Sequence, residues 1–190
     1  MKATRKQNVK RLTAALYGGE IVDYQTHCEQ EFHEYGFVFG LNDDFVLIQN
    51  VSKDVFLDGY SVLPVREIKS VIVGKETFLP RGLAHFDEKP SAPSGICLDD
   101  SPSLLASADV HFPLVSLEVG RKKPGCLFVG RVADLKNRYV MLRQITSEAK
   151  WEETPRKYRL RDITRVDFGG RYEAALWRVA QSELTNSDSA

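Results

Sequence analysis

The chain has 190 residues, of which 43% are hydrophobic and 10% aromatic, and its 26 basic and 26 acidic residues give zero formal net charge. These values are ordinary for a globular protein and exclude a chain dominated by charge of one sign. No apolar run approaches the roughly 20 residues that a membrane span needs, and no signal-peptide run opens the sequence. We therefore expect a cytoplasmic protein without a membrane span.

The neutral total hides an uneven distribution of charge. Residues 1–19 hold five basic residues and no acidic one, residues 20–119 have a net charge of −11, and residues 120–178 have a net charge of +8. The three cysteines show no CxxC spacing, as expected of reduced thiols. His27, Cys28 and His33 lie near one another in the sequence but fall short of the four ligands of a structural zinc site, so neither metal nor cofactor is predicted.

The first half of the chain reads as a helix followed by five short strands. Apolar residues recur at helical spacing from position 9 to position 16 and stop at Gly18 and Gly19, which favour a helix end. Strands are predicted over 21–26, 32–40, 45–51, 60–65 and 70–73, with turns at 29–31 and 41–44 and a single helical turn at 66–68. Together they form a first unit over residues 1–79.

A linker and a second unit follow. Residues 80–113 contain five of the eight prolines, a composition typical of a linker, with a brief helix expected over 103–108. The second unit, residues 114–184, has predicted strands over 114–119, 126–133, 139–145, 157–160 and 165–168 and a helix over 172–184. Residues 185–190 are expected to be a disordered tail.

The two units are an internal duplication. The sequence that starts at Gly36 matches the sequence that starts at Gly130, and an insertion of one residue later changes the offset from 94 to 95. Most matched positions are apolar, so the repeat describes a core. An open sheet of five short strands would expose its edges, and closure removes them. The sequence therefore predicts a mainly β fold of two tandem small β-barrels with short flanking helices.

Each unit resembles the first motif of the Sm-like barrels: a glycine, an apolar residue two positions later, another five later and a bulky apolar residue nine later. The residues that carry this resemblance are Gly36, Val38, Leu41 and Phe45 in the first copy and Gly130, Val132, Leu135 and Tyr139 in the second. The resemblance implies five-stranded Sm-like barrels. The positions that the family uses for RNA binding hold other residues here, namely Asn42 and Val46 in the first copy and Lys136 and Val140 in the second.

The second unit contains a stripe of basic residues. Lys157, Arg159 and Arg161 alternate with Tyr158 and Leu160, and side chains two apart in a strand lie on one face. Arginine suits phosphate oxygens, so this pattern predicts a phosphate or nucleic-acid contact surface. The alternative is a solvated face, or one docked against the acidic first unit. The candidate contact residues are Lys157, Arg159, Arg161, Arg165 and Arg171, with Lys122, Lys123, Arg138, Arg143 and Arg156 adding to the field.

The first unit contains a stripe of aromatic residues. Tyr35, Phe37 and Phe39 alternate with Gly36 and Val38, so they share one strand face. An exposed row of aromatic side chains indicates a contact surface, which makes these three residues a candidate interface between the units or in a homodimer. The alternative is a bent strand that buries both of its faces.

The function predicted from these features is binding rather than catalysis. The sequence has no nucleophile motif, no phosphate-cradling glycine loop and no dinucleotide fingerprint. Glu67 and Asp162 occupy matched positions before the last strand of each unit, where an acid can cap helical N–H groups. We expect a non-enzymatic binding or assembly module with a protein partner or self-association. The alternative is nucleic-acid binding, of RNA in particular, through the basic second unit.

Overall fold

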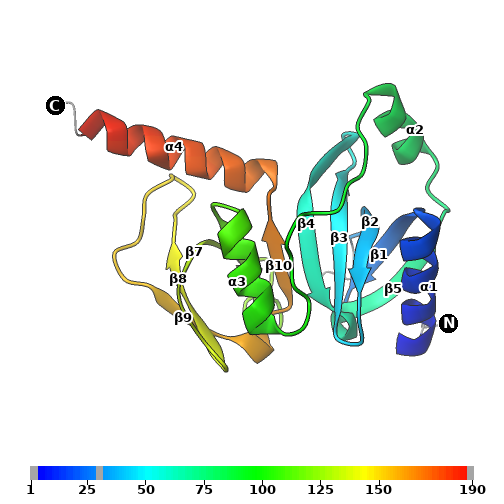
Figure 1. The fold of residues 1–190 in the computed structure, drawn as a ribbon, viewed down its shortest axis with the longest axis horizontal. Coiled ribbons are helices and arrows are strands. Elements are labelled where there is room, and N and C mark those ends of the chain that lie inside the picture. The colour runs from blue at the N-terminus through cyan, green and yellow to red at the C-terminus, as the bar shows by residue number, and fades with distance from the viewer. Residues whose placement is uncertain (1–3, 29–31, 188–190) are drawn as a thin grey trace. The chain divides into compact units, whose positions relative to one another are not determined.

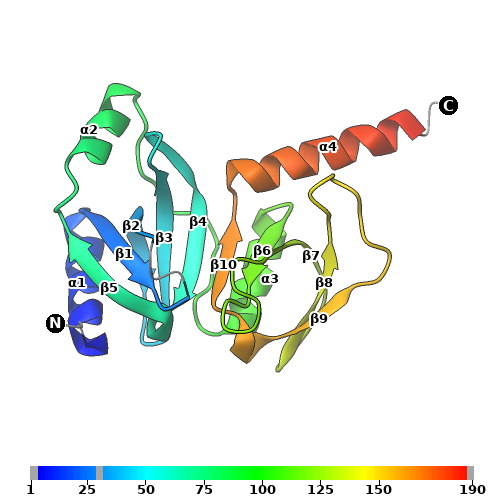
Figure 2. The ribbon, with the colours of Figure 1, turned by 180° about the vertical axis from the view of Figure 1, so that it is seen from behind.

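A computed structural model describes residues 4–28 and 32–187 of the chain, with side chains described up to Ser182. The structure is mainly β, as predicted, and all of the strand pairs that it records are antiparallel (Figures 1 and 2). The chain forms two compact units, residues 1–94 and 95–190, so the division falls inside the predicted linker.

Unit 1 is a five-stranded sheet with two helices. Its elements are α1 (Arg5–Gly18), β1 (Ile21–Thr26), β2 (Glu34–Leu41), β3 (Phe45–Ser52), β4 (Phe56–Pro64), the 3-10 turn η1 (Val65–Glu67), β5 (Ile68–Val73) and α2 (Phe78–His85). The strand order is β5-β1-β2-β3-β4, which places the last strand beside the first. Because β4 and β5 lie at opposite ends of this order, the recorded pairs do not close unit 1 into the predicted barrel.

Helix α1 is fixed to the sheet of unit 1 by both polar and apolar contacts. Thr4 and Gln7 form a capping box at its start, and Gly19 ends it in the left-handed conformation that glycine adopts without strain. The Asn8 amide donates to the backbone carbonyl of Ile68 at 3.1 Å. On the same side of the helix, Leu12 and Ala15 complete the main core of the unit.

Unit 2 has the same arrangement of strands. Its elements are α3 (Ser101–His111), β6 (Val115–Glu118), β7 (Leu127–Lys136), β8 (Tyr139–Gln144), β9 (Arg156–Arg159), the 3-10 turn η2 (Leu160–Asp162), β10 (Arg165–Phe168) and α4 (Arg171–Ser187). The strand order is β10-β6-β7-β8-β9, again with the last strand beside the first. The recorded pairs do not close this sheet either. A cluster of apolar residues packs α4 against it: Leu114, Val129, Ile145, Ala149, Leu176 and Ala180.

Details of the backbone recur at matched positions. Gly36 in β2 and Gly130 in β7 are buried, and a Cβ at either position would overlap the neighbouring strand. Each of these strands shifts register two to four residues after its glycine, between Val38 and Gly40 in β2 and between Val132 and Asp134 in β7. The register shift occurs at the same distance from the glycine in both units, so the two copies share a bend as well as a core.

The helices differ from the predictions in three places. Helix α2 was not predicted, and it crosses the expected boundary between the first unit and the linker, with Leu79 and Leu83 buried on either side of that boundary. Helix α3 covers 101–111 rather than 103–108, since Asp100 caps its N-terminus by accepting from the backbone of Ser103. Helix α4 continues into the predicted tail as far as position 187. The turn predicted at 29–31 and residues 188–190 of the tail lie outside the described residues.

Candidate nucleic-acid interface

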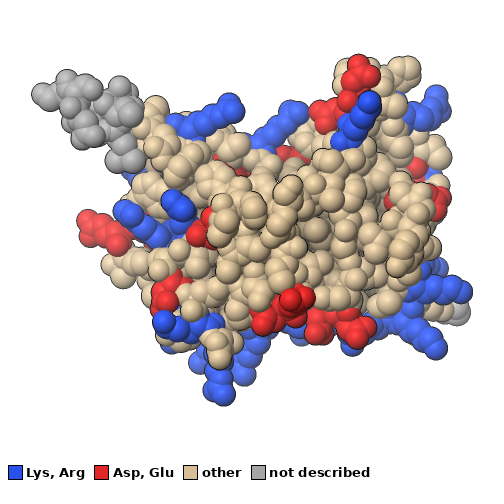
Figure 3. All heavy atoms as spheres, in the orientation of Figure 1, with Lys and Arg blue, Asp and Glu red and all other residues tan. Residues whose placement is uncertain are grey.

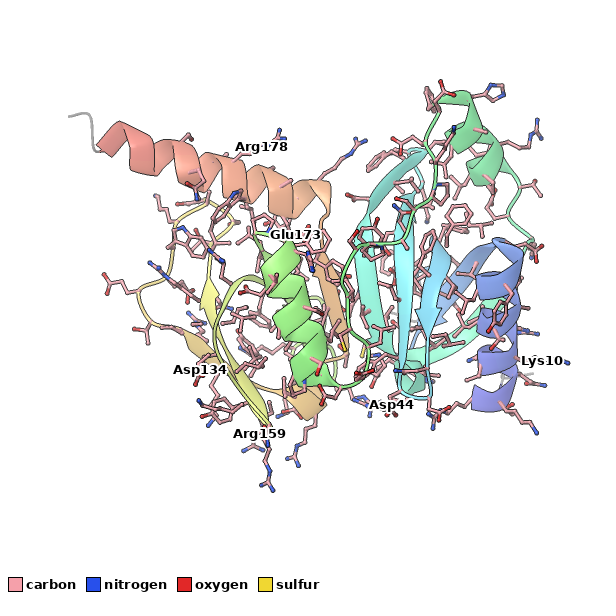
Figure 4. The ribbon with its side chains drawn as sticks, in the orientation of Figure 1. Lys10, Asp44, Asp134, Arg159, Glu173 and Arg178 are labelled. Carbon is pink, nitrogen blue, oxygen red and sulfur yellow. The ribbon has the colours of Figure 1, made fainter. Side chains whose placement is uncertain are left out.

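A pocket of about 630 Å³ lies at one end of unit 2, where β8, β9 and η2 meet the turn between β7 and β8. We call it the basic pocket, because four of the seven residues that line it are cationic. Its lining residues are Asn137, Arg138, Tyr139, Lys157, Arg159, Leu160 and Arg161. Figure 3 shows blue side chains gathered at the end of unit 2 where Figure 4 labels Arg159, which points away from the sheet.

The strand register explains why these side chains converge. Tyr139 pairs with Arg159 and Met141 pairs with Lys157 between β8 and β9, and paired residues share a face of the sheet. The N–H of Leu160 donates to the carbonyl of Arg138 at 3.1 Å, which fixes the β7–β8 turn beside η2. Three segments that are separate in sequence therefore supply one pocket.

The opposite face of β9 is packed into unit 2. Tyr158 lies against Phe128 with ring centroids 5.0 Å apart, and its hydroxyl accepts a 2.7 Å hydrogen bond from the buried amide of Gln144. Burial raises the pKa of Tyr158 to about 12. Leu160 is buried as well. Strand β9 thus holds its apolar side inside while its cations remain exposed.

The positive charge of the basic pocket is largely unneutralised. Within the described part of the chain, Arg138, Lys157 and Arg159 form no ion pair with a carboxylate. The ammonium of Lys157 lies 3.9 Å from the ring centroid of Tyr139, a cation–π contact. Arg161 is 4.0 Å from a carboxylate oxygen of Asp162.

Asp162 is the carboxylate that offsets part of this charge, because it interacts with Arg161 and Arg159, but its strongest partner is Lys122, outside the pocket lining. Its carboxylate accepts a hydrogen bond from Lys122 at 2.6 Å, and this bond lowers the pKa of Asp162. The residues at the N-cap positions of η1 and η2, Pro64 and Arg159, form no side-chain capping bond. That Glu67 and Asp162 cap these turns stays a prediction; Asp162 bonds a lysine, and Glu67 is buried beside Arg66.

The structure brings together three of the five predicted contact residues. Lys157, Arg159 and Arg161 line the basic pocket, whereas Arg165 and Arg171 do not. Arg165 is paired with Asp167 at 2.7 Å and is mostly buried, and Arg171 lies at the start of α4. Asn137 and Tyr139 also line the pocket and were not among the predicted site residues. The one available signal was their position at a predicted turn between two strands of the basic unit.

The aromatic stripe is a second core of unit 1 rather than an open surface. Phe37 is 8% exposed and packs with Leu79 and Leu83 of α2, while Tyr35 and Phe39 are half-buried against the same cluster. The three side chains do share the face opposite the main core, but α2 covers that face. The contact surface predicted at Tyr35, Phe37 and Phe39 is therefore occupied by the chain's own helix.

Other kinds of site find no support in the described residues. Within residues 4–28 and 32–187, no group of three or more His, Cys, Asp and Glu side chains is placed to hold a metal ion. His33 instead lies 2.6 Å from the carboxylate of Asp23. None of the described helices has both the length and the apolar character of a membrane span. Comparisons with protein-family models, curated proteins and solved structures find no match to the chain.

Proposed function

We propose that the chain is a non-enzymatic binding module whose second unit binds single-stranded RNA in the basic pocket. The observation that carries this proposal is the cluster of Arg138, Lys157, Arg159 and Arg161 around Tyr139, with three of the cations lacking a carboxylate partner in the described residues. Phosphate groups would neutralise these cations. The planar guanidinium groups offer stacking surfaces for bases, and the Tyr139 ring would do so on the face that the Lys157 ammonium does not cover.

The shape of the site favours a single strand over a duplex. A concave pocket of this volume admits side groups that project from a strand, whereas a duplex presents its bases only at groove edges. Stacking on an aromatic ring also requires an unpaired base. Phosphate contacts do not distinguish sequences, so we expect affinity with little sequence preference.

Binding should be measured by fluorescence anisotropy with labelled 12-nucleotide RNA at several salt concentrations. Four cations at the pocket predict a slope of log affinity against log salt of about −3, since each contact with a single strand contributes about −0.7. The double variant Lys157→Gln/Arg159→Gln should weaken binding at least tenfold and flatten the slope by about half. A matched control is Arg178→Gln, because Arg178 is exposed and points outward from α4 (Figure 4).

Three outcomes would contradict the proposal. They are no binding at low salt, equal affinity of the pocket variant and the wild type, and equal loss of affinity in the Arg178→Gln control. A duplex RNA of the same length tests the preference for a single strand, and equal affinity for both would contradict that preference.

We further propose that each unit is an Sm-like small barrel. This proposal is supported by the order of strands, which places the fifth beside the first in both units, and by the matched glycines of β2 and β7. The resemblance does not carry the family's RNA-binding residues to this chain, so the proposed RNA site stands on the basic pocket alone.

A protein partner is the second candidate function, and one observation favours it. Phe78 and Phe86, at the two ends of α2, are 66% and 70% exposed although large apolar side chains are usually buried. Light scattering of the full chain tests self-association through this helix. A dimer that dissociates in a Phe78→Ser/Phe86→Ser variant would support the interface, and a wild-type monomer would exclude self-association.

A further inference from the structure

We propose that Arg131 and Arg143 bind the terminal phosphate of an RNA strand, so that unit 2 recognises a phosphorylated end. This inference rests on the proposed function and specifies its preferred substrate as single-stranded RNA with a phosphate monoester at one end. Arg131 in β7 and Arg143 in β8 are register partners, and we call them the arginine pair. Neither residue lines the basic pocket.

The arginine pair is an electrostatically unfavourable arrangement without a ligand. Directly opposed residues on antiparallel strands have their Cβ atoms about 4.5–5.5 Å apart, and like charges at such positions destabilise a sheet. Both side chains are exposed, and in the described residues neither forms a hydrogen bond or an ion pair with a carboxylate. An anion bound between the two guanidinium groups would attract both of them and offset their mutual repulsion.

Two tryptophans hold the guanidinium groups in place. Arg131 lies 5.9 Å from the ring centroid of Trp177, and Arg143 lies 5.2 Å from that of Trp151. The two indole rings meet edge to face at 6.4 Å and pack against the core of the unit. A guanidinium stacked on a ring keeps its N–H donors, which lie in its plane, available for an anion. The arginine pair is therefore positioned in advance of binding.

The arginine pair and the basic pocket lie on one face of the sheet. In β8, Tyr139, Met141 and Arg143 are two residues apart and share a face, on which Lys157 and Arg159 also lie. The rise of a strand puts Arg143 about 13 Å from Tyr139. A strand of RNA bound in the pocket can extend along this face to the arginine pair.

The sheet face ends directly beyond the arginine pair. The next residues on the same face are Val129 and Ile145, and both are buried in the cluster that Leu176 and Ala180 of α4 complete. Trp177 of the same helix stands at this boundary. An RNA strand that reaches the arginine pair has no exposed sheet face on which to continue, so the site suits its end.

The chemistry of a strand end matches the charge of the site. A phosphate monoester carries about −1.5 to −2 charges at pH 7 and offers three acceptor oxygens, whereas an internal phosphodiester carries one charge. Two guanidinium groups can each form a bidentate contact with such a group. The pair therefore favours a phosphorylated end over a hydroxyl end.

The test uses the 190-residue chain and internally labelled RNA of one sequence with a 5′-phosphate, a 3′-phosphate or hydroxyls at both ends. We expect one of the phosphorylated strands to bind about tenfold more tightly than the hydroxyl strand. The double variant Arg131→Gln/Arg143→Gln should reduce this ratio to about one, while Lys157→Gln/Arg159→Gln and the Arg178→Gln control should leave the ratio unchanged. Equal affinity for all three strands, or a ratio that survives in the arginine-pair variant, overturns the inference.

A second measurement separates this inference from the proposed function. Trp151 and Trp177 are the two tryptophans of the chain, so intrinsic fluorescence reports on the arginine pair. Inorganic phosphate should change this emission saturably in the wild type and not in Arg131→Gln/Arg143→Gln, with chloride at equal ionic strength as the control. Absence of RNA binding would overturn the proposed function, whereas absence of the phosphate response would overturn the arginine pair as a phosphate site.

Discussion

Tyr158 supports the cationic strand of the proposed site from its buried side. Its hydroxyl oxygen accepts a hydrogen bond from the amide of Gln144, which is 5% exposed, and its ring packs on Phe128. Removing the hydroxyl leaves a buried amide without this partner. We expect Tyr158→Phe to lower the free energy of unfolding by about 1–3 kcal/mol, measured by urea denaturation at pH 7. A loss as large in Tyr172→Phe, at an exposed tyrosine, would contradict this assignment.

Ionisation of the same tyrosine should make the free energy of unfolding depend on pH in the alkaline range. Its pKa in the folded protein is about 12, above the ordinary value of 10.0. Between these values the unfolded chain releases the proton while the folded chain retains it, so the free energy of unfolding falls as pH rises from about 10 to 12. Denaturation curves over this range should fall less steeply in Tyr158→Phe than in the wild type. Parallel curves would show that Tyr158 does not carry this dependence.

Single residues also show where sequence patterns fail to locate a site. Period-two spacing placed Lys157 and Arg159 on one face, and the structure has them there. Arg165 was a candidate because it follows this stripe closely in the sequence, but the sequence did not reveal that Asp167, two residues later, shares its face and pairs with it. Tyr139 lines the pocket because it is paired with Arg159 of β9. The sequence alone does not define which residues pair across two strands.

At the scale of elements, α2 is what closes the second core of unit 1. Leu83 is 2% exposed and packs on the cluster of Phe37, so Leu83→Ala should lower the free energy of unfolding by about 2–5 kcal/mol. Phe86→Ala, at an exposed position of the same segment, should change it by less than about 0.5 kcal/mol. Chemical denaturation of both variants tests this difference. Equal effects would show that the helix does not pack as described.

The strands were easier to predict than this helix. Strands β1 and β10 have the predicted bounds, because apolar residues and turn signals define them locally. Helix α2 has eight residues and contains Pro80 and Gly82, which lower intrinsic helix propensity. Its stability comes from burying leucines against aromatic residues some 40 positions earlier. A pattern within the helix sequence alone cannot indicate these long-range contacts.

At the scale of the whole molecule, the duplication predicts matched effects in separate units. Gly36→Ala and Gly130→Ala should each lower stability by about 1–3 kcal/mol, because a Cβ at either position overlaps the neighbouring strand. Gly18→Ala, at the end of α1, is the control and should be nearly neutral. Hydrogen exchange should report faster opening in unit 1 for Gly36→Ala and in unit 2 for Gly130→Ala. RNA affinity should fall more in the second variant, and the reverse order would contradict the assignment of binding to unit 2.

The two structural units differ much less in net charge than the sequence segments 20–119 and 120–178 do. Unit 1 has 11 basic and 13 acidic residues, and unit 2 has 15 basic and 13 acidic, so their net charges are only −2 and +2. The N-terminal helix supplies cations to unit 1, and the segment before β6 supplies acids to unit 2. The positive character of the proposed site is therefore a property of one sheet face, which bulk composition could not have located.

Strand β9 stands at the end of the strand order of unit 2, and three of its four residues are cationic. A free strand edge is a template on which another chain can add a strand, and lysine and arginine at that edge oppose such association. The residues proposed to hold RNA would therefore also oppose the addition of another strand at this edge. Their replacement by neutral residues should therefore lower the solubility of the protein even when no RNA is present.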